Sequence, residues 1–132
     1  MQFHGTVLWT ELNTKHVEKA KAFYAAAFGY SWQAMPMPGD SVYWIGSTPE
    51  ATMGTVGLFE MKGPAFEGIP DHWLTYFGID DIDARLAALP ALGGQVIRPA
   101  WDVPNVGRIA IVRGASGAVE GWMTPISRGP AA

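Results

Sequence analysis

Two stretches of this 132-residue chain repeat the same sequence patterns at a spacing of 65 residues. Each stretch begins with a β-rich run, continues with apolar residues at helical spacing and reaches a glycine suited to end a helix. Sliding one half onto the other without a gap superimposes Gly29 on Gly94, and likewise Trp9 on Leu74, Thr10 on Thr75, Ala22 on Ala87 and Ala26 on Ala91. Because only two copies exist, the repeat predicts one duplicated supersecondary unit rather than a solenoid.

In the first half, the pattern predicts a strand over residues 6–12 and a helix over residues 15–28. Asn13 and Thr14 offer side-chain oxygens for the N-cap of this helix. Three short runs after the glycine predict strands over residues 30–35, 41–45 and 55–61. The apolar stripe of the helix consists of Val17, Ala20, Phe23, Tyr24, Ala27 and Phe28.

The second half predicts the same order of elements. A β-rich run over residues 72–79 precedes Asp80 and Asp81, which are suited to cap a helix. Pro90 is expected to kink or shorten that helix, because proline removes a backbone donor. The remaining strand patterns cover residues 95–98, 108–113 and 119–123, with residues 99–107 and 114–117 as connections.

The chain is therefore expected to form a single α+β domain of two βαβββ modules. The first module covers about residues 5–62 and the second about residues 71–125. The glycine- and proline-rich residues 63–70 form the predicted linker, and residues 126–132 a frayed tail.

Composition narrows the functions that are open to the chain. Hydrophobic residues make up 48% and charged residues 16%, as expected for a globule that encloses a core. The net charge of −3 with no basic cluster argues against nucleic-acid binding, and no apolar run approaches the ~20 residues of a membrane span. The absence of cysteine excludes thiolate metal sites and is compatible with a cytoplasmic protein. Six tryptophans either fill the core or line a pocket for a flat ligand.

Several motifs resemble the vicinal oxygen chelate superfamily, which includes glyoxalases, bleomycin-resistance proteins and extradiol dioxygenases. They are closest to a subgroup of small members that begin with a Trp-x-Glu-Leu-x-Thr pattern. The motifs are Trp9-Thr10-Glu11-Leu12-Asn13-Thr14, Phe23-Tyr24, Phe28-Gly29-Tyr30, His72-Trp73-Leu74-Thr75-Tyr76, and Asp102-Val103-Pro104-Asn105-Val106-Gly107-Arg108.

The resemblance implies a curved, mixed sheet that forms a partial barrel around a concave pocket, with the helices outside. It also implies a homodimer. Metal-dependent members hold a divalent ion with four ligands, normally His or Gln on each first strand and Glu on each last strand.

This chain departs from that ligand pattern. The first-strand positions fall on Trp9 and Leu74, and the last-strand position of the second module falls on Gly121. None of these side chains offers a lone pair to a divalent ion, so no metal and no other cofactor is expected. Glu120 lies one residue before the ligand position, where a regular strand turns it to the other face and only a bulge turns it inward.

Strand alternation nominates the residues of the pocket. Val7 and Glu11 share a face with Trp9, and His72 and Tyr76 share a face with Leu74. Glu11, Tyr76 and His72 are the candidate catalytic residues, as general base, oxyanion donor and proton shuttle. The alternative is that Glu11 is a structural acceptor and that His72 is an exposed residue at a strand end. The candidate ligand-binding residues are Trp9, Val7, Leu74, Arg108 and Gly121.

Arg108 offers a bidentate clamp for a carboxylate, or else a salt bridge at the start of a strand. Three functions stay open at this point. The first is binding of a small aromatic or apolar metabolite without metal, and the second is a metal-free enzyme with Glu11 as its base. The third is a lyase or dioxygenase whose displaced metal ligands come from His72, Glu11 and Glu120.

Overall fold

The computed structural model describes residues 3–37 and 41–126. Contacts divide the chain into two compact units. The N-terminal unit is Trp9–Leu74, and the C-terminal unit combines the first eight residues with Thr75 onward. Of the predicted tail, residues 127–132 lie outside the described residues.

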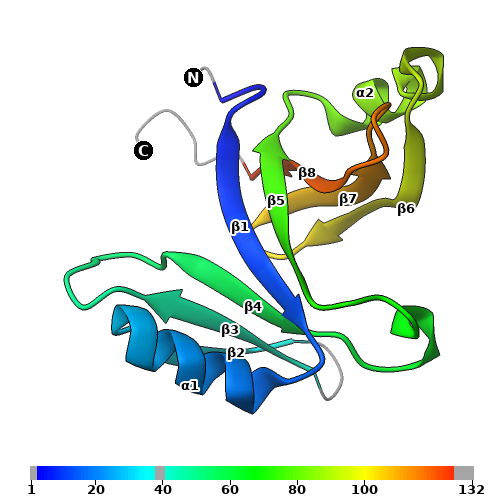
Figure 1. Cartoon of the computed structure of the whole chain (residues 1–132). Helices are drawn as coiled ribbons and strands as arrows, with labels where there is room; N and C mark the ends of the chain where they lie inside the picture. Colours follow the sequence, from blue (N-terminus) through cyan, green and yellow to red (C-terminus); the bar gives the residue numbers. More distant parts are fainter. Residues whose placement is uncertain (1–2, 38–40, 127–132) are drawn as a thin grey trace. The chain divides into compact units, whose positions relative to one another are not determined.

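The N-terminal unit contains a mixed four-stranded sheet and one α-helix (Figure 1). Its elements are β1 (Val7–Thr14, the first two residues belonging to the C-terminal unit), α1 (Val17–Phe28), β2 (Ser31–Pro36), β3 (Val42–Ser47), β4 (Val56–Glu60) and the short 3-10 helix η1 (Pro64–Phe66). The strand order is β2-β3-β4-β1. β1 runs parallel to β4, whereas β3 is antiparallel to both β2 and β4.

α1 packs on one face of this sheet. The strand register places Leu12, Trp44 and Leu58 side by side on that face, and Leu58 is completely buried. Lys21 of α1 lies 3.4 Å from the centre of the Trp44 ring, and the indole N–H of Trp32 donates to the Lys21 carbonyl at 3.1 Å. We call the opposite face, which carries Trp9, Glu11, Asn13, Tyr43, Gly57 and Phe59, the α1-distal face.

The ends of α1 agree only partly with the sequence analysis. Gly29 has the predicted left-handed conformation, with φ of 75°. The predicted N-cap is wrong, because Asn13 and Thr14 belong to β1 and the N-cap residue is His16, which makes no side-chain capping bond. The Thr14 hydroxyl instead accepts from the backbone N–H of His16 at 2.8 Å and donates to Asp71.

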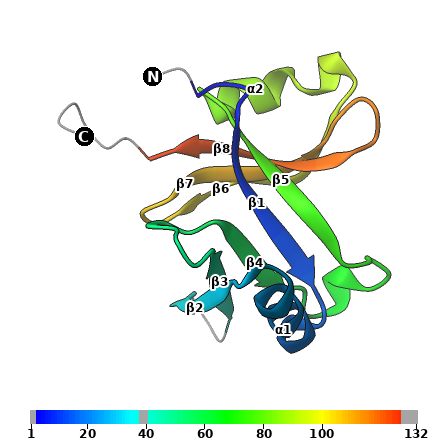
Figure 2. The same cartoon turned by 60° about the vertical axis from the view of Figure 1, so that its left-hand side comes forward.

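The C-terminal unit repeats this arrangement, as Figure 2 shows from another side. Its elements are β5 (His72–Gly78, the first three residues belonging to the N-terminal unit), α2 (Ile82–Ala88), the 3-10 helix η2 (Pro90–Leu92), β6 (Gln95–Val103), β7 (Gly107–Arg113) and β8 (Val119–Pro125). The strand order is β5-β8-β7-β6. β5 runs parallel to β8, and β7 is antiparallel to β6 and β8.

α2 covers one face of the second sheet. Asp81 caps the helix, since its carboxylate accepts from the Ala84 N–H at 3.2 Å, and Pro90 starts a 3-10 turn instead of a further α-turn. Ile82 of the helix is buried together with Ile79 and Ala110, and Leu86, Ala100 and Trp122 pack around them. The other face of the sheet is called the α2-distal face; it carries Tyr76, Arg98, Trp101, Ile109, Ile111, Arg113, Gly121 and Met123.

The α+β class and the two βαβββ modules are confirmed, since the first strand of each module runs parallel to its last strand. The predicted connection over residues 99–107 is wrong, because β6 continues to Val103. The register against β7 shifts on both sides of Arg98, and this irregularity accommodates Pro99, which lacks an N–H for the ladder. That both modules act as one domain stays a prediction.

The α-helices of the described residues, α1 and α2, are both too short to cross a membrane.

Candidate functional site

The α1-distal face is organised around a glycine on β4. Gly57 lies beside Glu11 of β1 and Ile45 of β3. A Cβ atom added at Gly57 would lie 2.5 Å from Cζ of Tyr43 and 2.7 Å from Nε1 of Trp9, and still closer to the Tyr43 hydroxyl. The indole N–H of Trp9 donates to that hydroxyl at 2.8 Å. The space above Gly57 is therefore filled by a hydrogen-bonded aromatic pair.

Glu11 lies on the same face and is 7% exposed. The side-chain amide of Asn13, two residues along β1, donates to Oε2 of Glu11 at 3.1 Å. Asn13 is also 7% exposed, so the pair is withdrawn from solvent. A buried carboxylate held in place by an amide donor is a candidate general base.

The α2-distal face contains the equivalent glycine. Tyr76, Gly121, Ile111 and Arg98 stand in one row across the four strands, and Trp101, Ile109 and Met123 stand in the next row. A Cβ atom added at Gly121 would lie 2.8 Å from Cγ of Tyr76, with two further ring atoms nearer. The Tyr76 ring, which is 7% exposed, therefore lies directly over Gly121.

Gly57 and Gly121 occupy the same place in their modules. Each lies on the last strand, and each is paired with a residue of the parallel first strand, Glu11 in one module and Tyr76 in the other. Gly121 was predicted from the sequence but Gly57 was not, because the 65-residue offset superimposes Gly57 on Trp122. The segment from Glu11 to Gly57 is one residue longer than the segment from Tyr76 to Gly121. An alignment of the two halves that allowed a one-residue gap would therefore have paired the two glycines.

The other predicted pocket residues are distributed over both units. Trp9, Glu11, His72 and Leu74 belong to the N-terminal unit; Val7, Tyr76, Arg108 and Gly121 belong to the C-terminal unit. Leu74 is buried at 5% exposure, and its carbonyl lies 3.4 Å from the Thr10 hydroxyl, whereas Val7 is 62% exposed. The Nδ1 atom of His72 lies 2.8 Å from the Pro70 carbonyl, a local contact at the start of β5.

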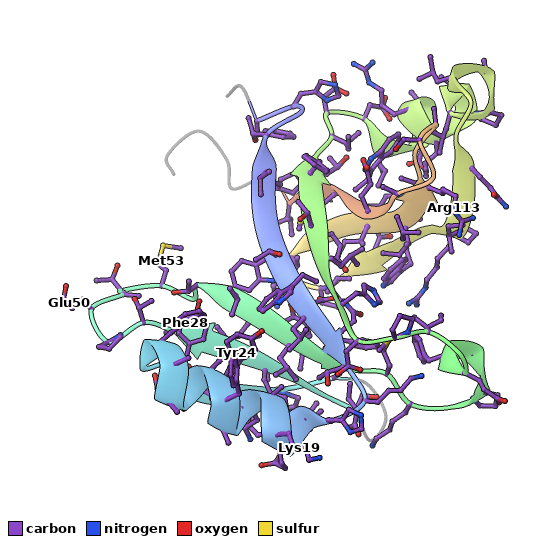
Figure 3. All side chains as sticks on the ribbon, in the orientation of Figure 1. Lys19, Tyr24, Phe28, Glu50, Met53 and Arg113 are labelled. Carbon is purple, nitrogen blue, oxygen red and sulfur yellow. The ribbon has the colours of Figure 1, made fainter. Side chains whose placement is uncertain are left out.

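A shallow groove of about 420 Å³ runs beside α1 in the N-terminal unit and includes His72 in its wall. Lys19 and Tyr24 of α1, both labelled in Figure 3, line it. Asp71 lies at its edge. Burial alone would raise the pKa of Asp71, but hydrogen bonds from Thr14 and the Lys15 backbone, with the neighbouring positive charges, lower the pKa below its usual range.

Arg108 makes the salt bridges that the sequence analysis gave as the alternative to ligand binding. Its Nε lies 3.0 Å from Asp83 of α2, and its Nη1 lies 3.2 Å from Asp102 of β6. These hydrogen bonds raise the pKa of Arg108 further. Register pairs Arg108 with Thr124, on the face that α2 covers, so the guanidinium lies away from the Gly121 row.

Glu120 lies on the face that α2 covers. β8 keeps an unbroken register against β7 from Val119 to Pro125, so Glu120 and Gly121 point to opposite sides. One carboxylate oxygen of Glu120 accepts from the indole N–H of Trp122 at 2.8 Å. The bulge that would turn Glu120 toward the ligand position is therefore absent from this pair of strands.

Comparison with known proteins assigns the chain to a family. The family model of the Glyoxalase/Bleomycin resistance protein/Dioxygenase superfamily matches residues 6–119. "Putative glyoxylase CFP32" of Mycobacterium bovis is 37% identical over 92% of this chain and 44% of its own length. The anthracycline biosynthesis protein DnrV of Streptomyces peucetius is 28% identical over 86% of this chain and 45% of its own length.

The chain thus spans less than half the length of these curated relatives. Among solved structures, methylmalonyl-CoA epimerase from Mycobacterium tuberculosis superimposes with a TM-score of 0.67 over 100% of this chain and 96% of the epimerase. At 13% identity that likeness concerns the fold alone. The repeated βαβββ order and the family match lead to one conclusion: the chain belongs to the Glyoxalase/Bleomycin resistance protein/Dioxygenase superfamily.

Proposed function

We propose that the chain binds a small aromatic or apolar metabolite on its α1-distal and α2-distal faces, without the divalent metal of the family's enzymes. The observation that carries this proposal is the packing over Gly57 and Gly121. Aromatic side chains occupy the space into which a side chain at either position would project. These faces offer rings and aliphatic groups to a ligand rather than a set of metal-binding oxygens.

The residues present do not fit a divalent ion of the family type. Such an ion needs imidazole nitrogen or carboxylate oxygen at the ligand positions. Trp9 and Leu74 stand at the two first-strand positions, and glycines stand at the two last-strand positions. The displaced-ligand alternative also loses support, because Glu120 is turned to the other face and bonded to Trp122.

The relatives are compatible with a flat ligand. DnrV is named for anthracycline biosynthesis, and anthracyclines contain fused aromatic rings. In this chain, indole and phenol rings stand on both distal faces, and rings stack favourably on flat ligands.

Titration with N-phenyl-1-naphthylamine, an uncharged dye that brightens in apolar surroundings, tests the proposal. We expect saturable binding at micromolar concentration that EDTA and added zinc leave unchanged. Replacing Trp9 or Trp101 by alanine should weaken binding, whereas replacing Phe28, which is 57% exposed on α1, should not. Absence of saturable binding to the wild-type chain, or binding that requires a divalent ion, would contradict the proposal.

A second candidate, a metal-free enzyme with Glu11 as general base, is favoured by one observation. The Glu11 carboxylate is buried on the α1-distal face and is held by Asn13. In this role Glu11 takes the proton of an acidic C–H bond next to a carbonyl, while the bonding electrons move to the carbonyl oxygen as an enolate forms. Return of a solvent deuteron to the carbon completes an exchange.

This exchange is measurable with ethyl 2-methylacetoacetate in D2O, by the loss of its C2 proton signal in NMR spectra. We expect the wild-type chain to accelerate the loss, and Glu11→Gln to reduce that acceleration about 100-fold, the usual contribution of a positioned base. Glu120→Gln, on the face that α2 covers in the C-terminal unit, is the matched control and should have no effect. Equal rates for the wild-type chain and Glu11→Gln would exclude this candidate.

We further propose that the chain acts as a homodimer in the cytoplasm. Both expectations come from the family resemblance and the composition, and both stay predictions.

A further inference from the structure

The irregular part of β6 brings together two residues that a regular strand would separate. Arg98 and Trp101 are three residues apart, so uninterrupted alternation would place them on opposite faces. The register shift between them changes the phase, and register pairs Arg98 with Ile111 and Trp101 with Ile109, which share the α2-distal face. The guanidinium of Arg98 consequently lies 3.6 Å from the centre of the Trp101 ring.

Among the described residues, Arg98 and Arg113 have no carboxylate within ion-pair distance, unlike Arg85 and Arg108, and of the two only Arg98 lies on an indole ring. Arg85 is bonded to Asp80, and Arg108 is bonded to Asp83 and Asp102. Stacking on an indole covers the flat side of a guanidinium and leaves its N–H edge available for an oxyanion. Arg98 is also exposed to solvent.

The acidic strand residues of this unit lie on one face of its sheet. The α2-distal face carries Arg98 and Arg113, which donates to Gln95 at 3.3 Å, and no Asp or Glu stands on it among the described strand residues. Asp102 and Glu120 point to the face that α2 covers, where Asp83 of the helix joins them. The α2-distal face therefore presents positive charge beside an apolar row.

We propose that Arg98, stacked on Trp101, binds the acidic group of the ligand. The ligand class is an aromatic or apolar organic acid whose ring lies against Ile111 and the Tyr76 ring, and whose carboxylate, sulfonate or phosphate meets the guanidinium edge. This inference rests on the proposed binding function and adds a chemical requirement to it. It also assigns ligand binding to Arg98 in place of Arg108.

Two dyes that differ by one acidic group test the inference. 8-Anilinonaphthalene-1-sulfonate is N-phenyl-1-naphthylamine with a sulfonate added. We expect the wild-type chain to bind the sulfonate more tightly than the neutral dye, and Arg98→Gln to weaken sulfonate binding about tenfold, as for loss of a charge-assisted hydrogen bond. Binding of the neutral dye should change less than twofold, and Arg98→Lys should be intermediate because it keeps the charge without the planar fork.

Arg85→Gln is the matched control, since it removes the same charge from the α2 side of the unit. It should leave both affinities unchanged. The inference is overturned if Arg85→Gln and Arg98→Gln weaken sulfonate binding equally, or if neither weakens it. Binding of the neutral dye would still support the proposed function in that case. Failure of the wild-type chain to bind the neutral dye refutes the proposed function, and sulfonate binding independent of Arg98 refutes the inference alone.

Discussion

Replacing Gly121 by alanine is expected to lower the free energy of unfolding by about 2 kcal/mol, in the range found for overpacked cores. The added methyl group would enter the space of the Tyr76 ring, with Cγ at 2.8 Å and other ring atoms nearer. Tyr76 is buried, so its ring has little room to move away. The entropy that alanine removes from the unfolded chain offsets only about 0.5 kcal/mol. Urea denaturation followed by circular dichroism measures the difference.

A double-mutant cycle with Tyr76→Ala separates this clash from other effects. Tyr76→Ala alone should destabilise the fold by about 3 kcal/mol, as other buried aromatic truncations do. In that background, Gly121→Ala should cost close to nothing, because the ring that excludes the methyl group is gone. A cost of Gly121→Ala that is the same in both backgrounds would mean that Tyr76 is not what requires the glycine.

Gly57→Ala should destabilise the fold more, by about 3 kcal/mol, because overpacking is joined by the loss of a hydrogen bond. The methyl group would approach the Tyr43 hydroxyl and lie 2.7 Å from Nε1 of Trp9, the two groups that bond to each other at 2.8 Å. One ring has to move, and the indole N–H then loses its acceptor. Thermal and urea unfolding give the magnitude, and tryptophan emission reports the altered environment of Trp9.

Tyr43→Phe is the companion variant for this site. It removes the atom nearest to the added methyl group and keeps the ring, so Gly57→Ala should cost at least 1 kcal/mol less in the Tyr43→Phe chain than in the wild-type chain. If Gly57→Ala costs the same in both chains, the Tyr43 hydroxyl is not the atom with which the added methyl group clashes.

Local patterns were sufficient to predict most of the fold. The glycine stop at Gly29, the cap at Asp81 and the shortening at Pro90 are dictated by backbone geometry within a few residues, and the structure has all three. The repeat of strand and helix predicted two βαβββ modules, because an order of elements is preserved even where identities are few.

The site was less predictable, because the face on which a strand residue lies depends on whether the strand alternates regularly or contains a register shift. Of the two orientations left open for Glu120, the structure has the one opposite Gly121, because β8 is regular. Arg98 was missed because a register shift, which alternation does not foresee, changes the phase of β6 and aligns Arg98 with Trp101. Arg108 was nominated from its motif with a salt bridge as the alternative, and the fold decides for the salt bridge because it brings Asp83 of α2 and Asp102 of β6 to the guanidinium.

The irregularity of β6 also bears on solubility. Among the described strands β6 pairs only with β7, so its outer side is an unprotected edge that could recruit strands from other molecules. Pro99 has no N–H to offer such a strand, and the register shifts distort the spacing that continuous pairing needs. A stretch that turns Arg98 toward the α2-distal face thus also discourages aggregation through the sheet edge, so straightening β6 would forfeit both properties at once.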